Sequence, residues 1–203
     1  MGIQPRADHG RDRAKSVKIV LIHGFNVKDG GASTVDRLAP YLIHAGHFCD
    51  MDEADYGWIG LLGVRLRKHA AVRRIAHAIQ TADVIISHSN GANYETKALK
   101  LHDHHKERYT IIRLSPALNS KEPIPENVKR GTVFFSRSDF WVWLSGFLPA
   151  HPWGRQGQRG YTGTDPRIEN RDFSDLISSH SDWFSDENIE FIAKEILLTL
   201  EQP

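Results

Sequence analysis

Short runs of apolar, mostly β-branched residues recur along the chain, and polar or glycine-rich segments separate them. Runs of this length and composition are typical of strands that are buried on both faces of a parallel sheet. Apolar residues at helical spacing follow several of these runs, which favours one α/β domain. The pattern predicts strands at 17–23, 84–86, 109–114 and 131–136, with less regular strands at 47–53 and near 160–163.

Helices are expected where apolar residues recur every three or four positions. A helix capped by Ser33 or Thr34 should end at Gly46, and Pro40 should kink or shorten it. The first residues, 1–16, are polar and charged, so we expect a disordered tail there. A single domain over 17–203 follows, with further helices predicted over 64–80, after Gly91, and over 185–200.

The composition is that of an ordinary globular protein. The 203 residues suffice for one domain with a sizeable core, and 26 basic minus 25 acidic residues give a net charge of only +1. Because no strong field would attract nucleic acid or a membrane surface, neither partner is expected. The N-terminus is too polar for a secretory signal, and no apolar run is long enough to span a membrane. Together with a single cysteine, Cys49, these features favour a cytoplasmic protein without an internal disulfide.

A distinctive corner follows the apolar run at 84–86, where Ser-His-Ser-Asn-Gly leads directly into a helical pattern. Strand, tight corner and helix form the layout of a nucleophile elbow, whose usual pattern is G-x-S-x-G. The central residue of such a corner sits on a strained turn, so the residues two positions away must be small. Ser87 and Gly91 both meet this requirement. The turn would direct the Ser89 hydroxyl towards a helix N-terminus, where free N–H groups favour developing negative charge.

On these residues the chain resembles the α/β-hydrolases, most closely the small esterases and lipases among them. The resemblance implies an α/β-hydrolase-like fold, with a mostly parallel central sheet, helices on both faces and a small aromatic cap. In that family a His-Gly pair after an early strand opens the oxyanion-hole loop. His23 and Gly24 match this pair, so the oxyanion hole would consist of the backbone N–H groups of Phe25 and Asn90. The resemblance extends from residue 17 to the C-terminus and is least evident at 55–63 and 150–170.

The resemblance also implies a catalytic triad in the chain order serine, acid, histidine. Ser89 is the nucleophile in this assignment, Asp139 follows the strand at 131–136, and His180 precedes the last helix. The carboxyl ends of parallel strands lie at one edge of a sheet, so the three side chains would meet there. Other residues could supply the acid or the base: Asp165, Asp172 and Asp175 for the acid, and His151 for the base.

Aromatic residues are dense between Phe140 and Trp153. We interpret the region 140–160 as a cap or lid over the site, with simple packing on the domain as the alternative. Aromatic side chains in such a position would favour a substrate with an apolar acyl or alcohol group. The candidate pocket residues are Trp58, Trp141, Trp143 and Phe147.

Several other polar features have structural interpretations. His88 is expected to pack beside the elbow, and the basic residues between Arg65 and Arg74 are expected to form a solvated helix face. The cluster His102-Asp103-His104-His105 lies at a polar helix end without a further spaced ligand. We therefore expect neither a metal site nor a cofactor.

The sequence thus predicts a serine hydrolase, most simply a carboxylesterase acting on a small ester with an apolar group. Thioester and amide hydrolysis remain open within the same fold, as do the acyl length and the oligomeric state. A catalytically inactive binding or structural protein with a hydrolase fold is the alternative, because fold does not fix function. An anion- or nucleic-acid-binding module built on the basic helix face is opposed by the near-neutral net charge.

Overall fold

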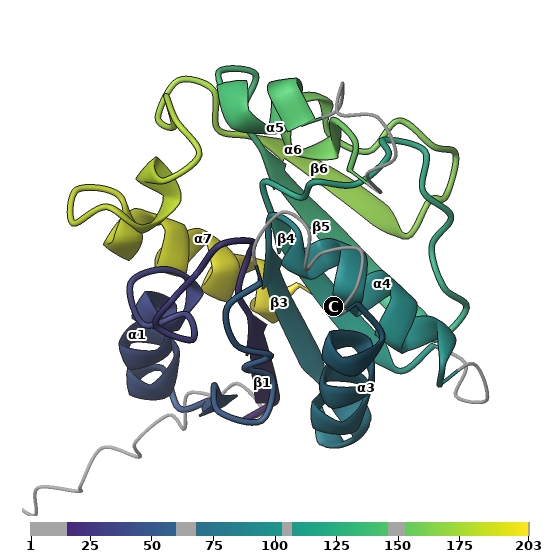
Figure 1. The fold of residues 1–203 in the computed structure, drawn as a ribbon. Helices are drawn as coiled ribbons and strands as arrows, with labels where there is room; N and C mark the ends of the chain where they lie inside the picture. Colours follow the sequence, from purple (N-terminus) through teal and green to yellow (C-terminus); the bar gives the residue numbers. More distant parts are fainter. Residues whose placement is uncertain (1–15, 60–67, 103–106, 146–152, 203) are drawn as a thin grey trace, which may run out of the picture.

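A six-stranded parallel sheet forms the centre of the structure (Figure 1). The computed structural model describes residues 16–59, 68–102, 107–145 and 153–202. Within these ranges the strands pair in the order β2-β1-β3-β4-β5-β6, and each pairing is parallel. The strands are β1 Lys18–Ile22, β2 Phe48–Asp50, β3 Val84–His88, β4 Tyr109–Leu114, β5 Val128–Phe135 and β6 Ile168–Asp172.

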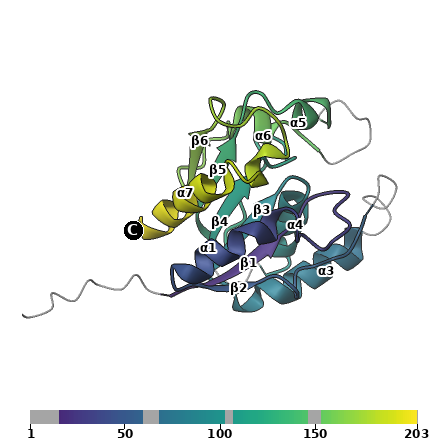
Figure 2. The ribbon, with the colours of Figure 1, turned by 90° about the vertical axis from the view of Figure 1, so that its left-hand side faces the viewer.

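Helices cover both faces of the sheet (Figures 1 and 2). On one face α3 and α4 pack on Ile85 of β3, and on the other α1 and α7 pack on Val84 and Ile86. Because both faces are covered, β3 is apolar at successive positions rather than alternating. No helix among the described residues is long and apolar enough to cross a membrane. The α-helices are α1 Ala39–His44, α3 Lys68–Ala78, α4 Gly91–Lys100, α5 Phe140–Ser145, α6 Gln156–Arg159 and α7 Ile189–Glu201. Short 3₁₀ helices are η1 Val35–Leu38, η2 Ile79–Thr81 and η3 Asp182–Phe184.

The predicted last strand near 160–163 is wrong, because the last strand is β6 at Ile168–Asp172. Gly160 follows α6 with φ 73°, a left-handed turn conformation that a strand does not contain. Among the described strands β6 pairs only with β5, at the edge of the sheet, and four of its five residues are polar. An edge strand of this kind carries no apolar run for the sequence pattern to detect.

Helix boundaries also differ from the expected ones. The first helix is divided into η1 and α1, with Pro40 in the first turn of α1, so the proline does shorten the helix. Thr34 precedes η1, but its hydroxyl donates to Gly31 O and does not cap the helix. The last helix begins at Ile189, one turn after the expected start at Ser185. Residues 1–15 of the expected tail, 60–67 and 146–152 lie outside the described residues.

The carboxyl ends of the strands all lie at one edge of this parallel sheet. Segments that leave β1, β3, β4 and β5 therefore begin close together. These segments carry the His-Gly loop, the Ser89 corner and Asp139, and the segment between β6 and η3 carries His180. The topology thus brings the predicted site residues to one place.

Candidate active site

Ser89 occupies the corner between β3 and α4 in a strained backbone conformation. Its φ is 52°, which non-glycine residues rarely adopt, and its N–H donates to Leu114 O at 3.1 Å. Such strain persists only where the surroundings hold it, and it clusters at functional sites. The residue is 8% exposed, and it lines a pocket together with His180. The structure therefore has the corner geometry that the sequence predicted.

Two glycines let the first strand approach this corner. A Cβ at Gly91 would lie 2.5 Å from His23 O, which no real contact permits. A Cβ at Gly24 would lie 3.1 Å from Ser89 Cβ, tighter than ordinary packing. Any larger residue at Gly91 would push the elbow helix away from the His-Gly loop. Gly91 is therefore required for close packing between α4 and the end of β1.

A buried ion pair lies beneath the corner and explains why Ser87 stands where the pattern usually has glycine. The Ser87 hydroxyl donates to the Glu95 carboxylate, which pairs with Arg113 at 2.8 Å. The side chains of Glu95 and Arg113 are both 0% exposed, and Arg113 also donates to Thr96 Oγ1 at 3.0 Å. A buried charge is tolerated only when it is paired and hydrogen-bonded. This network links β3, α4 and β4 directly below Ser89.

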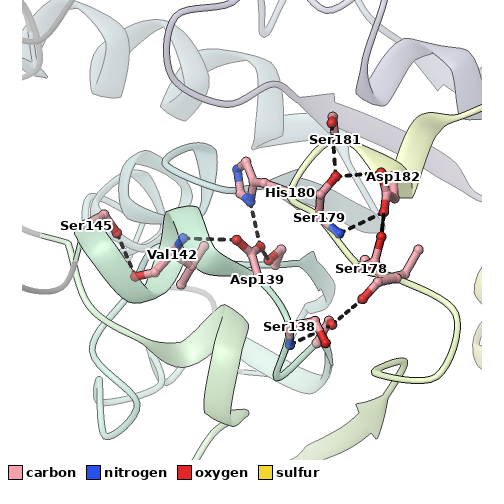
Figure 3. A network of polar contacts seen from close by, with 12 residues as sticks. Ser138, Asp139, Val142, Ser145, Ser178, Ser179, His180, Ser181 and Asp182 are labelled. Atoms are coloured by element: carbon pink, nitrogen blue, oxygen red, sulfur yellow. Dashed lines mark hydrogen bonds and ion pairs between the residues drawn. The ribbon is translucent and has the colours of Figure 1, made fainter.

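Asp139 and His180 are in direct contact. The N–H at His180 Nδ1 donates to Asp139 Oδ2 at 2.7 Å (Figure 3). Ser115 Oγ donates to the same oxygen. The other oxygen, Oδ1, accepts from the Val142 N–H at 3.0 Å. Burial raises the pKa of Asp139, but the hydrogen bonds from His180 and Ser115 outweigh it and lower the pKa below its usual value. The carboxylate is therefore ionised at neutral pH and fixes which nitrogen of His180 carries the proton.

The loop that carries His180 is held by its own hydrogen bonds. Asp182 accepts from the backbone N–H groups of Ser178 and Ser179 at 3.0 and 2.7 Å (Figure 3). The ring of His88 packs against the ring of His180, with centroids 4.7 Å apart. Burial and the neighbouring His180 hold the pKa of His88 well below its usual range, so this ring is neutral. His88 thus packs beside the elbow, as expected from the sequence.

The His-Gly loop is fixed by Tyr56, a residue the sequence did not single out. The single proton of the Tyr56 hydroxyl is shared between two carbonyl oxygens, His23 O at 2.8 Å and Gly24 O at 2.7 Å. Its ring stacks on His23 with centroids 4.0 Å apart. The Gly24–Phe25 peptide is trans, so the Phe25 N–H points away from the carbonyl that Tyr56 holds. Phe25 itself lines the pocket beside Ser89.

The pocket has a volume of about 460 Å³ and opens between this loop and α5. Trp141 lines it as expected, whereas Trp143 stacks on Phe140, with centroids 5.6 Å apart. Trp58 is half exposed and donates to Asn26 Oδ1 at 2.8 Å, so it does not line the pocket. Phe147 lies outside the described residues.

Trp153 is the second residue that the sequence did not assign to the pocket. Its indole N–H donates to Asn90 Oδ1 at 2.6 Å, and its ring packs edge-on against Phe25, with centroids 5.3 Å apart. It therefore contacts both residues of the expected oxyanion hole. The aromatic density of 140–153 was the only signal that could have identified it.

Two of the three alternative acids, Asp165 and Asp172, have other partners, and no hydrogen bond or ion pair joins Asp175 to His180 in the described part of the chain. Asp165 pairs with Arg167 at 2.6 Å, and Asp172 accepts from the Ser174 N–H at 3.0 Å. Asp139 is the carboxylate that the structure places against His180. The alternative base, His151, lies outside the described residues.

Comparisons with known proteins identify the fold. No family model and no curated protein match the sequence. A pyrethroid hydrolase from Sphingobium faniae JZ-2 matches with a TM-score of 0.61 at 14% identity, over 93% of this chain and 99% of that chain. An extracellular α/β-hydrolase from a Paenibacillus species matches with a TM-score of 0.57 at 12% identity, over 92% and 100%.

A CIB-like hydrolase from Thermoplasma acidophilum matches with a TM-score of 0.52 at 15% identity, over 94% of this chain and 89% of that chain. At such low identities a structural likeness establishes the fold and leaves the activity to be argued from the site. The expected α/β-hydrolase fold is confirmed.

Proposed function

We propose that the protein is a serine hydrolase that cleaves small carboxylic esters through an acyl-enzyme formed on Ser89. The observation that carries the proposal is the 2.7 Å contact between Asp139 and His180, made beside a serine held at φ 52° in the same pocket. Serine nucleophiles need a base to accept the proton and a third group to orient that base. The hydrolase names of the structural neighbours agree with this class of reaction.

In the proposed acylation, Ser89 Oγ attacks the ester carbonyl and His180 Nε2 takes its proton. Asp139 accepts from Nδ1–H, which leaves Nε2 free as the base and stabilises the imidazolium that forms. The N–H groups of Phe25 and Asn90 donate to the oxyanion of the tetrahedral intermediate. His180 then protonates the departing alcohol oxygen, and the acyl group remains on Ser89.

Deacylation repeats these steps with water as the nucleophile. His180 removes a proton from water, the hydroxide attacks the acyl carbon, and the tetrahedral intermediate collapses to release the acid and regenerate Ser89. The proton taken from Ser89 leaves on the alcohol, and the proton that His180 takes from water restores the Ser89 hydroxyl, so the steps balance without a cofactor. The apolar lining of the pocket, with Trp141, Val142 and Leu144 from α5, supports a substrate with an apolar group.

The test is hydrolysis of a panel of chromogenic esters of graded acyl length by wild type and Ser89→Ala. We expect measurable turnover by wild type, with a preference among acyl lengths, and none above background by Ser89→Ala. Ser120→Ala removes a serine hydroxyl outside the pocket and should retain full activity. Equal turnover by wild type and Ser89→Ala, or no turnover by correctly folded wild type, would favour the catalytically inactive binding protein.

A further inference from the structure

Trp153 contacts both residues whose N–H groups form the proposed oxyanion hole. Phe25 follows β1 and Asn90 follows β3, so the two donors belong to separate segments of the chain. An oxyanion is stabilised fully only when both N–H groups lie about 2.7–3.1 Å from the same oxygen atom. The spacing of the two donors therefore depends on the contacts that hold one segment against the other.

The side chain of Asn90 is bound to the indole rather than to its own helix. Asparagine at the start of a helix commonly accepts a hydrogen bond from a backbone N–H of the first turn. Asn90 makes no such bond, and its Oδ1 accepts from the Trp153 indole N–H at 2.6 Å. Because an indole nitrogen is only a donor, this contact fixes which atom of the Asn90 amide faces Trp153. Asn90 is 1% exposed, so loss of the indole would remove a buried hydrogen bond.

The ring of Trp153 holds the residue that carries the other donor. It packs edge-on against Phe25 with centroids 5.3 Å apart, an arrangement that aromatic pairs prefer. Both rings also pack against the buried core on the sheet face that α3 and α4 cover. A shift of the His-Gly loop relative to Asn90 would disturb this packing. One side chain therefore binds Asn90 through its N–H and Phe25 through its ring.

The segment that carries Trp153 is fixed to the Ser89 corner through its backbone. A Cβ at Gly154 would lie 2.3 Å from Leu118 O, so only glycine permits this approach. The Gln156 N–H donates to the same Leu118 O at 2.9 Å, and the Ala117 N–H donates to Ser89 O at 3.0 Å. Main-chain hydrogen bonds thus connect residues 154–156 to the corner by way of residues 117–118. The place of Trp153 beside Asn90 is set by this packing.

We propose that Trp153 is a positioning residue that holds the N–H groups of Phe25 and Asn90 at the spacing that one oxyanion requires. This inference rests on the proposed esterase function and adds to it a residue that touches neither the reacting atoms nor the oxyanion. Its contribution is made only when negative charge develops on the carbonyl oxygen. Loss of Trp153 should therefore lower kcat and leave the binding of a short ester largely unchanged.

The first test compares wild type and Trp153→Phe, a variant that keeps an aromatic ring against Phe25 and removes the indole N–H. The substrate is a chromogenic acetate, because a short acyl group depends least on the lining of the pocket. We expect kcat to fall about tenfold, the effect of about one net hydrogen bond, and KM to change less than about twofold. If Trp153 only lined the pocket, KM would rise and kcat would stay the same.

A second measurement uses a trifluoromethyl ketone as a reversible inhibitor. Ser89 Oγ adds to the ketone carbon, the serine proton passes to His180, and the ketone oxygen becomes an oxyanion held by the two N–H groups. The inhibition constant of Trp153→Phe should rise by the same factor by which kcat/KM falls, since the adduct resembles the transition state. The melting temperature of each sample shows whether the variant is folded.

Asn90→Leu tests whether the indole acts through Asn90. This variant removes the carbonyl oxygen that accepts from Trp153 and keeps the backbone N–H. If the hydrogen bond carries the effect, Trp153→Phe should lower kcat about tenfold in wild type but less than about twofold in Asn90→Leu. Trp143→Phe is the matched control, because this tryptophan stacks on Phe140 and does not line the pocket. Its kcat should equal that of wild type.

An unchanged kcat in folded Trp153→Phe, while Ser89→Ala is inactive, would overturn the positioning role and leave the esterase function intact. The inference also fails if the effects of Trp153→Phe and Asn90→Leu simply multiply, or if Trp143→Phe loses as much activity as Trp153→Phe. If folded wild-type protein hydrolyses no ester, the proposed function fails, and the positioning role fails with it.

Discussion

Removal of the Tyr56 hydroxyl is predicted to slow turnover without weakening substrate binding. This hydroxyl shares its proton between His23 O and Gly24 O at 2.8 and 2.7 Å and so fixes the peptide that carries the Phe25 N–H. Burial, and then Tyr94 and Asp55, raise the pKa of Tyr56 well above its usual range, so the hydroxyl is a donor at neutral pH. Tyr56→Phe removes this shared hydrogen bond and keeps the ring that stacks on His23.

The size of the effect follows from the contacts that are lost and retained. Gly24 O keeps its contact with His23 Nδ1 at 2.9 Å, so the peptide becomes less constrained but is not released. The lost hydroxyl stabilises the loop by about 1–2 kcal/mol net. If this free energy acts only on the transition state, its loss lowers the rate about tenfold. Outright loss of an oxyanion donor, which costs about 10²–10³ in kcat, sets the upper limit.

The assay is steady-state hydrolysis of one chromogenic ester, with the melting temperature measured on the same samples. Tyr56→Phe should lower kcat about tenfold with little change in KM. Tyr109→Phe is the matched control. It also removes a buried tyrosine hydroxyl, but Tyr109 is the first residue of β4, far from the carboxyl ends of the strands where the site lies. This hydroxyl has no hydrogen-bond partner among the described residues. A loss of melting temperature with unchanged kcat in Tyr56→Phe, or a rise in KM alone, would show that this hydroxyl does not support the oxyanion hole.

Three further predictions concern charged side chains that are buried or partly buried. Asp139→Asn should lower kcat by up to about 10⁴ with little change in KM, whereas Asp165→Asn should retain wild-type kinetics in the same assay. Glu95→Leu should lower the free energy of unfolding by about 3–5 kcal/mol, because it leaves Arg113 buried and unpaired. The double variant Glu95→Leu/Arg113→Met should regain most of this free energy, and chemical denaturation measures both values. Burial, and then Asp55, raise the pKa of Asp36 to about 7, so its contribution to stability is lost as pH rises from the unfolded-state value of 3.8 through 7. Asp36→Asn should therefore raise the melting temperature more at about pH 8 than at about pH 4.5, and the opposite order would contradict this assignment.

The central part of the fold could be predicted from sequence because burial on both faces leaves a continuous apolar run. β1, β3 and β4 all have this property, and each was placed within about two residues of its observed bounds. β6 was misplaced because it lies at the sheet edge, and Ile168 is its only apolar residue. The pattern of the sequence reports burial and so detects an edge strand poorly.

The candidate site divides in a similar way. Ser89, Asp139 and His180 could be nominated because each follows a recognisable strand or precedes a recognisable helix. Tyr56 and Trp153 could not, because their roles depend on contacts with Gly24 and Asn90, which are far away in sequence. The same holds for the pocket beside Ser89, whose walls combine segments that follow different strands.

The most direct test of the account is covalent labelling of the folded protein with a fluorophosphonate, followed by mass spectrometry of the modified peptide. This reagent reacts with an activated serine, and its phosphonyl oxygen would occupy the position of the oxyanion. We expect one adduct, on Ser89, that is absent in Ser89→Ala and forms more slowly in Asp139→Asn. An adduct on another serine, or none on folded wild-type protein, would contradict it.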